Sequence, residues 1–331
     1  MVMKKLSTWI KGSLAVCVLA SANAYAQDVQ EINFGIISTE SSQNLRPQWE
    51  PFLADMEEQT GYKIVPFFAS DYAGLIQGMR FDKVDIAWFG NKSAMEAVDR
   101  AGGEVVYQTT DVEGNGGYWS LLITHKDSPL NSIEDVLANA KDLSFGNGDP
   151  NSTSGFLVPS YYVFSQNNVD PKEIFKRTVN ANYEVNALSV VNKQVDLATN
   201  NTANIVRLER SNPEKAAEIK EIWRSPLIPS DPIVWRTNLP QEVKDKLDNF
   251  FANYGDKPEE VEKLKVLLWG KFRKSDNDQL LPIRQLELFK TRNEVIANEG
   301  LSKDDKETKL AEIDGQLKQL EERMTELSAK K

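Results

Sequence analysis

Three adjacent hydroxyl side chains are the clearest chemical feature of this sequence. Ser152, Thr153 and Ser154 stand between the turn residues "GNGDPN" (146–151) and an apolar run that begins at Gly155. A predicted strand leads into this turn and a predicted helix leaves it, and the first turn of a helix has about four backbone N–H groups without partners inside the helix. These donors, the three hydroxyls and the positive end of the helix dipole would together bind an oxyanion. Helix capping is the simpler alternative, but it needs only one hydroxyl.

Polar and aromatic residues stand at the ends of the other predicted strands. They are Asp71, Tyr72, Trp88, Phe89, Tyr118, Asn200, Asn201, Thr202 and Asp231. Ligands of open α/β sheets bind beyond the carboxyl ends of the strands, so these residues are candidates for the wall of a cleft. Taken singly, each aromatic residue is more often part of a core. A carboxylate beside tyrosine rings suits an ammonium group, which makes Asp231, with Tyr72 and Tyr118, the candidate second end of the site.

The composition excludes several classes of catalytic and metal site. The chain has one cysteine, Cys17, and one histidine, His125. Nucleophilic triads built on histidine and zinc sites built on His and Cys therefore have almost nothing to use. His125 follows an apolar strand and precedes a turn, and we interpret it as a surface residue. We expect neither an enzyme nor a metal or cofactor site, although a hydrolase that uses two carboxylates stays open as an alternative.

The first 26 residues resemble a secretory signal. Lys4 and Lys5 give a basic start, "SLAVCVLA" (13–20) is a short apolar core, and "AYA" (24–26) has the small-x-small pattern of a cleavage site. We expect cleavage after Ala26; a lipoprotein anchored through Cys17 is the less favoured alternative. Loss of three lysines changes the net charge from −10 to −13, because this segment has no acidic residue. So acidic a chain is a poor candidate for binding nucleic acid.

Strand-like and helix-like segments alternate from residue 32 to residue 236, which predicts α/β lobes with largely parallel sheets. The last hundred residues are mainly helical. The final charged segment has apolar residues at steps of four and three: Ile313, Leu317, Leu320, Met324 and Leu327. This narrow seam predicts either a helix packed on its own chain or a homodimer formed through the C-terminal helix.

Five long segments are similar to the periplasmic phosphonate-binding proteins of ABC importers. They are "FGIISTESSQNLRPQWEPFLADME" (34–57), "DYAGLIQGMRFDKVDIAWFGNKSAMEAVDRAGG" (71–103), "GYWSLLI" (117–123), "LSFGNGDPNSTSGFLVPSYYVF" (143–164) and "SPLIPSDPIVWR" (225–236). The resemblance implies a two-lobed type II periplasmic-binding-protein fold with a helical C-terminal extension. It also implies a periplasmic receptor that captures phosphonates between its lobes and delivers them to a membrane permease driven by a cytoplasmic ATPase.

The resemblance implies the following organisation. Residues 1–26 would be the signal peptide, residues 27–117 and 229–298 a discontinuous lobe 1, residues 118–228 lobe 2, and residues 299–331 a C-terminal helix. Ser152, Thr153 and Ser154 would hold the phosphonate group, and Tyr72, Tyr118 and Asp231 would surround an aminoalkyl substituent. Asn200, Asn201, Thr202 and Ala203 are further candidates for the cleft.

Two positions depart from the family pattern. Tyr183 stands in "NANYE" where a histidine is expected, and Ala203 stands in "NNTAN" where an acidic residue is expected. Tyr183 can still donate to an oxyanion but adds no positive charge. Ala203 removes one carboxylate from the amine end, so the ligand can be 2-aminoethylphosphonate or a simpler alkylphosphonate. A receptor for phosphate or phosphite, and a dimeric periplasmic adaptor without a small ligand, stay open as alternatives.

Overall fold

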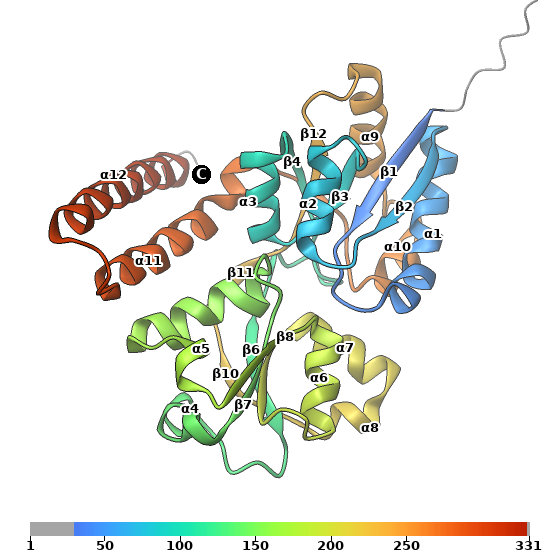
Figure 1. The fold of residues 1–331 in the computed structure, drawn as a ribbon. Coiled ribbons are helices and arrows are strands. Elements are labelled where there is room, and N and C mark those ends of the chain that lie inside the picture. Colours follow the sequence, from blue (N-terminus) through green and yellow to red (C-terminus); the bar gives the residue numbers. More distant parts are fainter. Residues whose placement is uncertain (1–29, 330–331) are drawn as a thin grey trace, which may run out of the picture.

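The computed structural model describes residues 30–329, so the predicted signal peptide lies outside the described residues. Two β-sheets organise this part of the chain (Figure 1). The first has the order β13-β4-β12-β3-β1-β2 and contains β1 (Glu31–Ile36), β2 (Lys63–Phe68), β3 (Ile86–Trp88), β4 (Gly103–Gln108), β12 (Pro232–Arg236) and β13 (Arg273–Lys274). The second has the order β10-β6-β9-β7-β8 and contains β6 (Ser120–His125), β7 (Ser144–Asn147), β8 (Arg177–Asn180), β9 (Leu197–Asn201) and β10 (Ile219–Arg224). We call the regions around them lobe 1 and lobe 2.

Both sheets are mixed, whereas the sequence predicted largely parallel ones. In lobe 1, β1 runs parallel to β2 and β3, but β12 is antiparallel to both β3 and β4. In lobe 2, β7 is parallel to β8 and β9, while β6 is antiparallel to β9 and β10. The strands β6, β10 and β12, each of which takes part in an antiparallel pair, follow or precede a passage between the lobes, and β13 is antiparallel to β4. Their direction is set by where the chain enters each sheet, which hydrophobic periodicity does not report.

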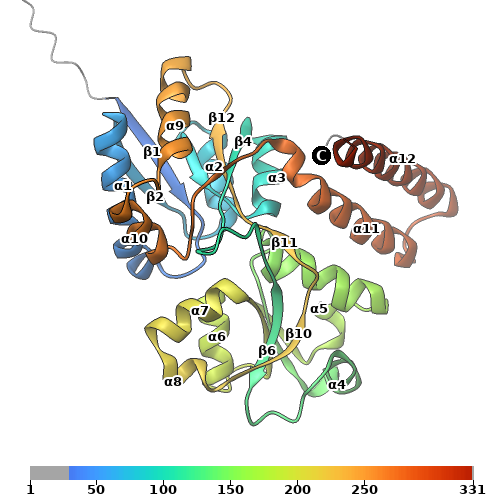
Figure 2. The same ribbon diagram turned by 180° about the vertical axis from the view of Figure 1, so that it is seen from behind.

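Helices cover the sheets of both lobes (Figures 1 and 2). Those of lobe 1 are α1 (Ser42–Thr60), α2 (Tyr72–Arg80), α3 (Asn91–Arg100), α9 (Gln241–Asn253) and α10 (Pro258–Val266). Those of lobe 2 are α4 (Ile133–Asn139), η1 (Ala140–Asp142), α5 (Pro171–Ile174), α6 (Tyr183–Val191), α7 (Thr202–Ser211) and α8 (Pro213–Ala216). Polar side chains begin most of them; for example, Asp71 accepts from the N–H of Gly74 at the start of α2.

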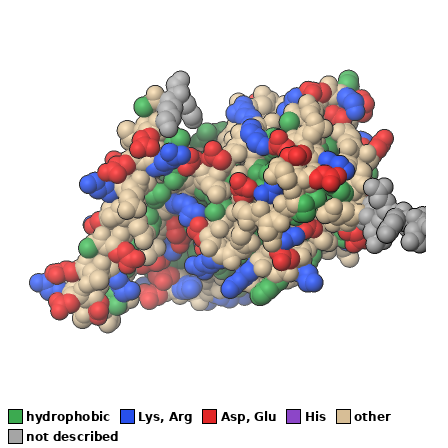
Figure 3. All heavy atoms as spheres, turned by 90° about the horizontal axis from the view of Figure 1, so that it is seen from above, with side chains coloured by type: hydrophobic (Ala, Val, Ile, Leu, Met, Phe, Trp, Pro, Cys, Tyr) green, Lys and Arg blue, Asp and Glu red, His purple; other side chains and the backbone are tan. Residues whose placement is uncertain are grey.

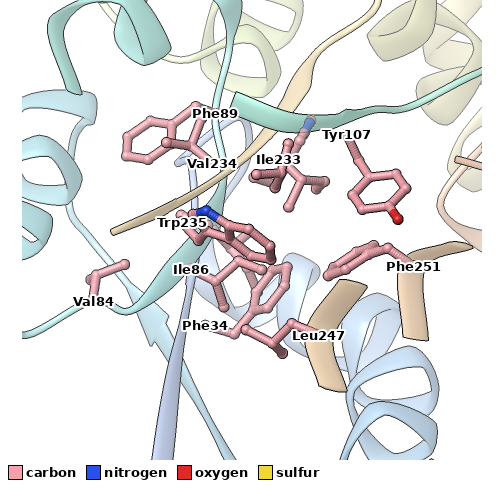
Figure 4. Close-up of a cluster of buried hydrophobic side chains, with 14 of the residues drawn as sticks. Phe34, Val84, Ile86, Phe89, Tyr107, Ile233, Val234, Trp235, Leu247 and Phe251 are labelled. Atoms are coloured by element: carbon pink, nitrogen blue, oxygen red, sulfur yellow. The ribbon is translucent and has the colours of Figure 1, made fainter. Parts of the chain in front are cut away.

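The core of lobe 1 is rich in aromatic residues (Figure 4). Phe34 on β1 is fully buried and lies 6.1 Å, centroid to centroid, from Phe52 on α1. Tyr107 on β4 stacks on Phe251 of α9 at 5.4 Å. Burial of one such side chain stabilises the fold by roughly 1.5–3 kcal/mol, so this core holds rigid the strand ends from which the pocket residues project.

The chain crosses between the lobes at a short pair of strands. β5 (Gly117–Tyr118) pairs antiparallel with β11 (Ile228–Pro229), so that Tyr118 lies opposite Ile228. Gly117 is necessary here, since a Cβ would lie 2.7 Å from the side chain of Leu227 and 2.9 Å from the carbonyl of Ile228. The pair lies between the two lobes, where Figure 2 labels β11. It holds Tyr118 in β5, and Asp231 follows β11 by two residues.

The helix after the hydroxyl run is irregular. It consists of two π-helical turns, η2 (Thr153–Leu157) and η3 (Ser160–Phe164), and a final 3-10 turn, η4 (Ser165–Asn167). Pro159 lies between the two π-helical turns. Because proline has no N–H to donate and its ring clashes with the preceding turn, a wider local winding lets the helix continue through it.

A helical hairpin follows lobe 1 and projects from the side of the molecule (Figure 1). After η5 (Asn277–Leu280), α11 (Leu281–Ala297) packs against α12 (Lys303–Ser328). Along the apolar seam of α12, Ile313 is buried and Leu317, Leu320, Met324 and Leu327 are partly buried, so the seam faces α11. Ion pairs of Arg292 with Asp314 and of Arg323 with Asp278 hold the hairpin. Packing on its own chain thus accounts for the seam, and a homodimer formed through this helix stays an untested alternative.

His125 is buried, so its interpretation as a surface residue was wrong. Only 9% of it is exposed, and its Nε2 lies 3.3 Å from Glu218 Oε2 across β6 and β10. The register places it inside the strand pair, although a turn follows directly. It does not line the pocket described below.

None of the helices in residues 30–329 has both the length and the hydrophobicity that a membrane-spanning segment needs. Acidic and basic side chains are interspersed on the face shown in Figure 3.

Candidate ligand-binding pocket

A pocket lies where the two lobes meet. Its volume is about 80 Å³, enough for several groups the size of a water, each of which needs roughly 10–15 Å³. The candidates from the sequence that line it are Tyr72, Trp88, Tyr118, Thr153, Tyr183, Asn201, Ala203 and Asp231. Other lining residues include Thr39, Gly90, Thr109, Arg207, Leu267 and Trp269. The pocket therefore suits a small molecule and draws on both lobes.

The N-termini of several helices converge on this pocket. Tyr72 is the first residue of α2, Gly90 precedes α3, Tyr183 is the first residue of α6, and Asn201 precedes α7. Thr153 adds the start of the irregular helix. All five residues line the pocket. Each helix start contributes partial positive charge and N–H groups, so the pocket favours an anion without needing a positively charged side chain.

The hydroxyl run forms one wall of this region together with Tyr183. The Tyr183 hydroxyl is hydrogen-bonded to Ser152 Oγ at 2.6 Å and to Ser154 Oγ at 2.8 Å. Asn201 Nδ2 donates to Ser154 Oγ at 3.3 Å. Thr153 points differently, since its Oγ1 accepts the N–H of Lys92 on α3 at 2.8 Å and so joins lobe 2 to lobe 1. Thr153 lines the pocket directly, while Ser152 and Ser154 contact the Tyr183 hydroxyl behind it.

Close backbone approach at the hydroxyl run depends on two glycines. Gly148 donates its N–H to the carbonyl of Gly155 at 3.0 Å, and a Cβ on Gly148 would lie 2.4 Å from that carbonyl oxygen. A Cβ on Gly155 would lie 2.8 Å from Ser152 Oγ. Because neither position has room for a side chain, the turn holds the hydroxyls close together.

Asn200 and Thr202 support the pocket from behind rather than lining it. Asn200 Nδ2 donates to the carbonyl of Tyr183 at 3.0 Å, which fixes the start of α6. Thr202 Oγ1 accepts the N–H of Trp119 at 3.3 Å. Of the four candidates in residues 200–203, Asn201 and Ala203 line the pocket, whereas Asn200 and Thr202 do not.

Asp231 forms an acidic end of the pocket. Tyr118 donates its hydroxyl to Asp231 Oδ1 at 3.0 Å, and Asn91 Nδ2 lies 3.5 Å from the same oxygen. Burial raises the pKa of Asp231 from its ordinary 3.8 to about 7, against the lowering effects of the Tyr118 hydrogen bond and the Arg207 charge. Burial also raises the pKa of Tyr72 and Tyr118 well above 10, so both stay neutral donors. An ammonium group would restore the charged form of Asp231.

Arg207 is the functional candidate that the sequence analysis missed. Its guanidinium reaches the pocket from α7 and donates through Nη2 to the carbonyl of Leu267 at 3.3 Å. Its Nε lies 3.7 Å from Glu40 Oε1. Burial lowers the pKa of Arg207, and the charges of Glu40 and Asp231 oppose that effect. Arg207 follows Ala203 by four residues on one helix, so the two share a face, and this spacing could have identified it.

The described residues contain no group of three or more His, Cys, Asp or Glu side chains that could hold a metal ion. The three carboxylates Asp71, Asp149 and Asp231, which lie near the predicted strand ends, have different roles. Asp71 caps α2, and Asp149 accepts the N–H of Tyr72 at 3.2 Å and that of Asn151 at 2.7 Å. Only Asp231 of these three lines the pocket. The arrangement favours binding by hydrogen bonds and charge.

Comparison with known proteins shows the family of this chain. Residues 34–280 match the family described as the periplasmic substrate-binding protein of a phosphonate ABC transporter. A phosphonates-binding periplasmic protein of Escherichia coli K12 is 60% identical over 312 residues, which are 94% of this chain and 92% of that protein.

Solved structures give the same result. A binding-protein component of an ABC phosphonate transporter from Pseudomonas aeruginosa is 63% identical, with a TM-score of 0.89 over 91% of this chain and all of the other. A Prochlorococcus marinus protein in complex with methylphosphonate shares the fold, with a TM-score of 0.70 at 20% identity over 80% of this chain and all of the other. The matching family and the Pseudomonas aeruginosa protein are described as binding components of ABC transporters, not as enzymes. The chain therefore belongs to the periplasmic phosphonate-binding substrate-binding proteins of ABC transporters.

Proposed function

We propose that this protein captures a phosphonate in the pocket between its lobes and delivers it to an ABC permease and its cytoplasmic ATPase. The observation that carries the proposal is the convergence of helix N-termini, Thr153 and the Tyr183 hydroxyl on one small pocket. A phosphonate group has three oxygens around one centre, so donors arriving from several directions can each find an acceptor. Ser152 and Ser154 would assist through Tyr183 or by rotating toward the oxyanion.

The substituent on phosphorus would lie toward Tyr72, Tyr118 and Asp231. Asp231 with the Tyr118 hydroxyl suits an ammonium group, as in 2-aminoethylphosphonate. Ala203 supplies no second carboxylate there. The affinity of simpler alkylphosphonates would therefore fall less far below that of aminoalkyl phosphonates than with two carboxylates.

Contacts between the lobes support a mechanism of closure. Asn44 Nδ2 on α1 donates to Glu184 Oε1 on α6 at 2.6 Å, and Tyr72 N–H donates to Asp149 Oδ2 at 3.2 Å. A ligand that bridges the lobes would stabilise this closed arrangement, in which both lobes together form the surface that the permease reads. We place the lobe boundaries at residues 27–117 with 229–298 and at residues 118–228.

We further propose that residues 1–26 act as a signal peptide, cleaved after Ala26, that exports the chain to the periplasm. The mature protein would then carry the whole described fold.

Titration calorimetry on residues 27–331 tests the proposal. The ligands are 2-aminoethylphosphonate, methylphosphonate, ethylphosphonate, phosphite and phosphate. We expect saturable binding of the phosphonates, with phosphate and phosphite at least tenfold weaker. Tighter binding of phosphate or phosphite would instead make the protein a receptor for that anion. No binding of any of the five would contradict a receptor for small phosphorus oxyanions.

A further inference from the structure

Three polar atoms of the pocket residues lack a hydrogen-bond partner within residues 30–329. They are Thr39 Oγ1, Trp88 Nε1 and Arg207 Nε, and each is buried from solvent. All three residues line the same pocket. A buried donor left unpaired costs about 1–3 kcal/mol, so three of them in one small pocket point to a ligand that accepts hydrogen bonds.

Two of these donors, on Arg207 and Trp88, belong to side chains that contact residues 267–269 at the pocket wall. Arg207 Nη2 donates to the carbonyl of Leu267, and the ring of Trp269 packs on that of Trp88 with centroids 5.5 Å apart. Trp88 also pairs in register with Ile36, three residues before Thr39. The set differs from the hydroxyl run, whose oxygens already have protein partners.

The guanidinium of Arg207 is only partly used by the protein. Of its five N–H groups, one donates to Leu267, and the Nε···Oε1 distance of 3.7 Å to Glu40 is too long for a hydrogen bond. Glu40 Oε1 itself has no hydrogen-bond partner in the described residues. The Arg207 side chain is 15% exposed, and among the described residues that line the pocket it is the one with a positive charge.

The groups facing Arg207 decide what a ligand must bring. Glu40 and Asp231 supply negative charge near it, and Ala203, one turn earlier on α7, leaves the space of a small side chain. A carboxylate alone would meet Asp231 unfavourably. A tail that carries both an ammonium and a carboxylate pairs each with its opposite, the ammonium with Asp231 and the carboxylate with Arg207.

We infer that the pocket selects phosphonates whose carbon tail carries a carboxylate beside an ammonium group, with 2-amino-3-phosphonopropionate as the representative. The inference rests on the proposed function, because the phosphonate group is placed at the helix N-termini. The ammonium binds Asp231 and Tyr118, and the carboxylate accepts from Arg207, Trp88 and Thr39. Ala203 in place of an acidic residue is then part of the specificity, since a carboxylate there would repel that of the ligand.

Calorimetry of the mature chain with 2-amino-3-phosphonopropionate and 2-aminoethylphosphonate tests this selection. We expect the first ligand to bind about ten- to hundredfold more tightly, which is the effect of one or two charge-assisted hydrogen bonds. Arg207→Gln should remove most of that ratio. Arg210→Gln is the matched control, because Arg210 lies on the same helix and donates across the lobes to the carbonyl of Lys265 at 2.9 Å without lining the pocket. It should leave the ratio unchanged.

The outcomes separate the two proposals. Binding of 2-aminoethylphosphonate with equal or weaker binding of 2-amino-3-phosphonopropionate would overturn the inference and leave the proposed function standing. A preference for the carboxylated ligand that survives in Arg207→Gln would also overturn it. Failure of both ligands and of methylphosphonate would contradict the proposed function itself.

Discussion

The backbone N–H of Lys92 in lobe 1 donates to Oγ1 of Thr153 in lobe 2 at 2.8 Å. This bond joins the N-terminus of α3 to the hydroxyl run at the wall of the pocket. Gly90 lies beside it, and a Cβ added at Gly90 would lie 3.4 Å from Thr153 Oγ1. One side chain thus both lines the pocket and joins the lobes, so a ligand that binds Thr153 would couple binding to closure.

Thr153→Ala should weaken every phosphonate alike, by about tenfold, because one hydroxyl is worth about 0.5–1.5 kcal/mol and the lobe contact is lost with it. Calorimetry with methylphosphonate and 2-aminoethylphosphonate measures the effect. Thr153→Ser, which keeps the hydroxyl, is the control and should retain most of the affinity. Unchanged binding in the alanine variant would show that the oxyanion lies elsewhere.

Asp231 should make the ligand-free protein less stable as the pH rises. Its pKa is raised in the folded state from 3.8 to about 7, so the contribution of its protonated form to stability is complete below pH 4 and is lost as the pH rises through 7. Asp231→Asn removes this dependence. Urea unfolding should therefore find the variant more stable than the wild type at pH 8, by about 2–4 kcal/mol, and nearly equal to it at pH 4. The same difference at both pH values would contradict a buried, titrating Asp231.

Tyr183→His should give oxyanion binding a new pH dependence. Imidazole becomes a charged donor near pH 6.5, and a charged hydrogen bond is about 1 kcal/mol stronger than a neutral one. For a single phosphonate, the affinity of the variant relative to the wild type should rise about fivefold between pH 8 and pH 6. Titration of the ligand cancels in this ratio. A flat ratio would mean that residue 183 does not contact the oxyanion.

The C-terminal hairpin should contribute to stability without contributing to binding. No residue of α12 lines the pocket, and its seam faces α11. Removal of residues 299–331 should lower the melting temperature while phosphonate affinity changes less than twofold. Because packing on α11 accounts for the seam, we expect light scattering to give a monomer mass for the full chain. A dimer that dissociates on truncation would support the alternative reading of the seam.

The sequence predicted the α/β class and the polar residues at the strand ends, because local signals mark them, but it did not predict that both sheets are mixed. Turn residues, hydroxyls and glycines lie next to one another in the chain, so the run from Ser152 to Ser154 could be found directly. Contacts between residues far apart in the sequence could not be predicted in this way. Nothing near Thr153 indicates Lys92, and nothing near Trp88 indicates that Arg207 closes the other side of its pocket.

Other differences have the same physical origin. The burial of His125 depends on the strand pairing with β10, which brings Glu218 beside it from more than ninety positions away. The antiparallel course of β12 depends on the return of the chain from lobe 2. Propensity and periodicity report neighbours along the chain, whereas these features are set by tertiary contacts.

A crystal structure of the mature protein with 2-aminoethylphosphonate tests the account most directly. We predict the phosphonate oxygens within hydrogen-bonding distance of Thr153 Oγ1, the Tyr183 hydroxyl and the N–H groups that begin the surrounding helices, with the ammonium on Asp231. Density for the phosphonate at Arg207 instead, with the ammonium away from Asp231, would contradict the assigned orientation. Density outside the pocket between the lobes would contradict the account as a whole.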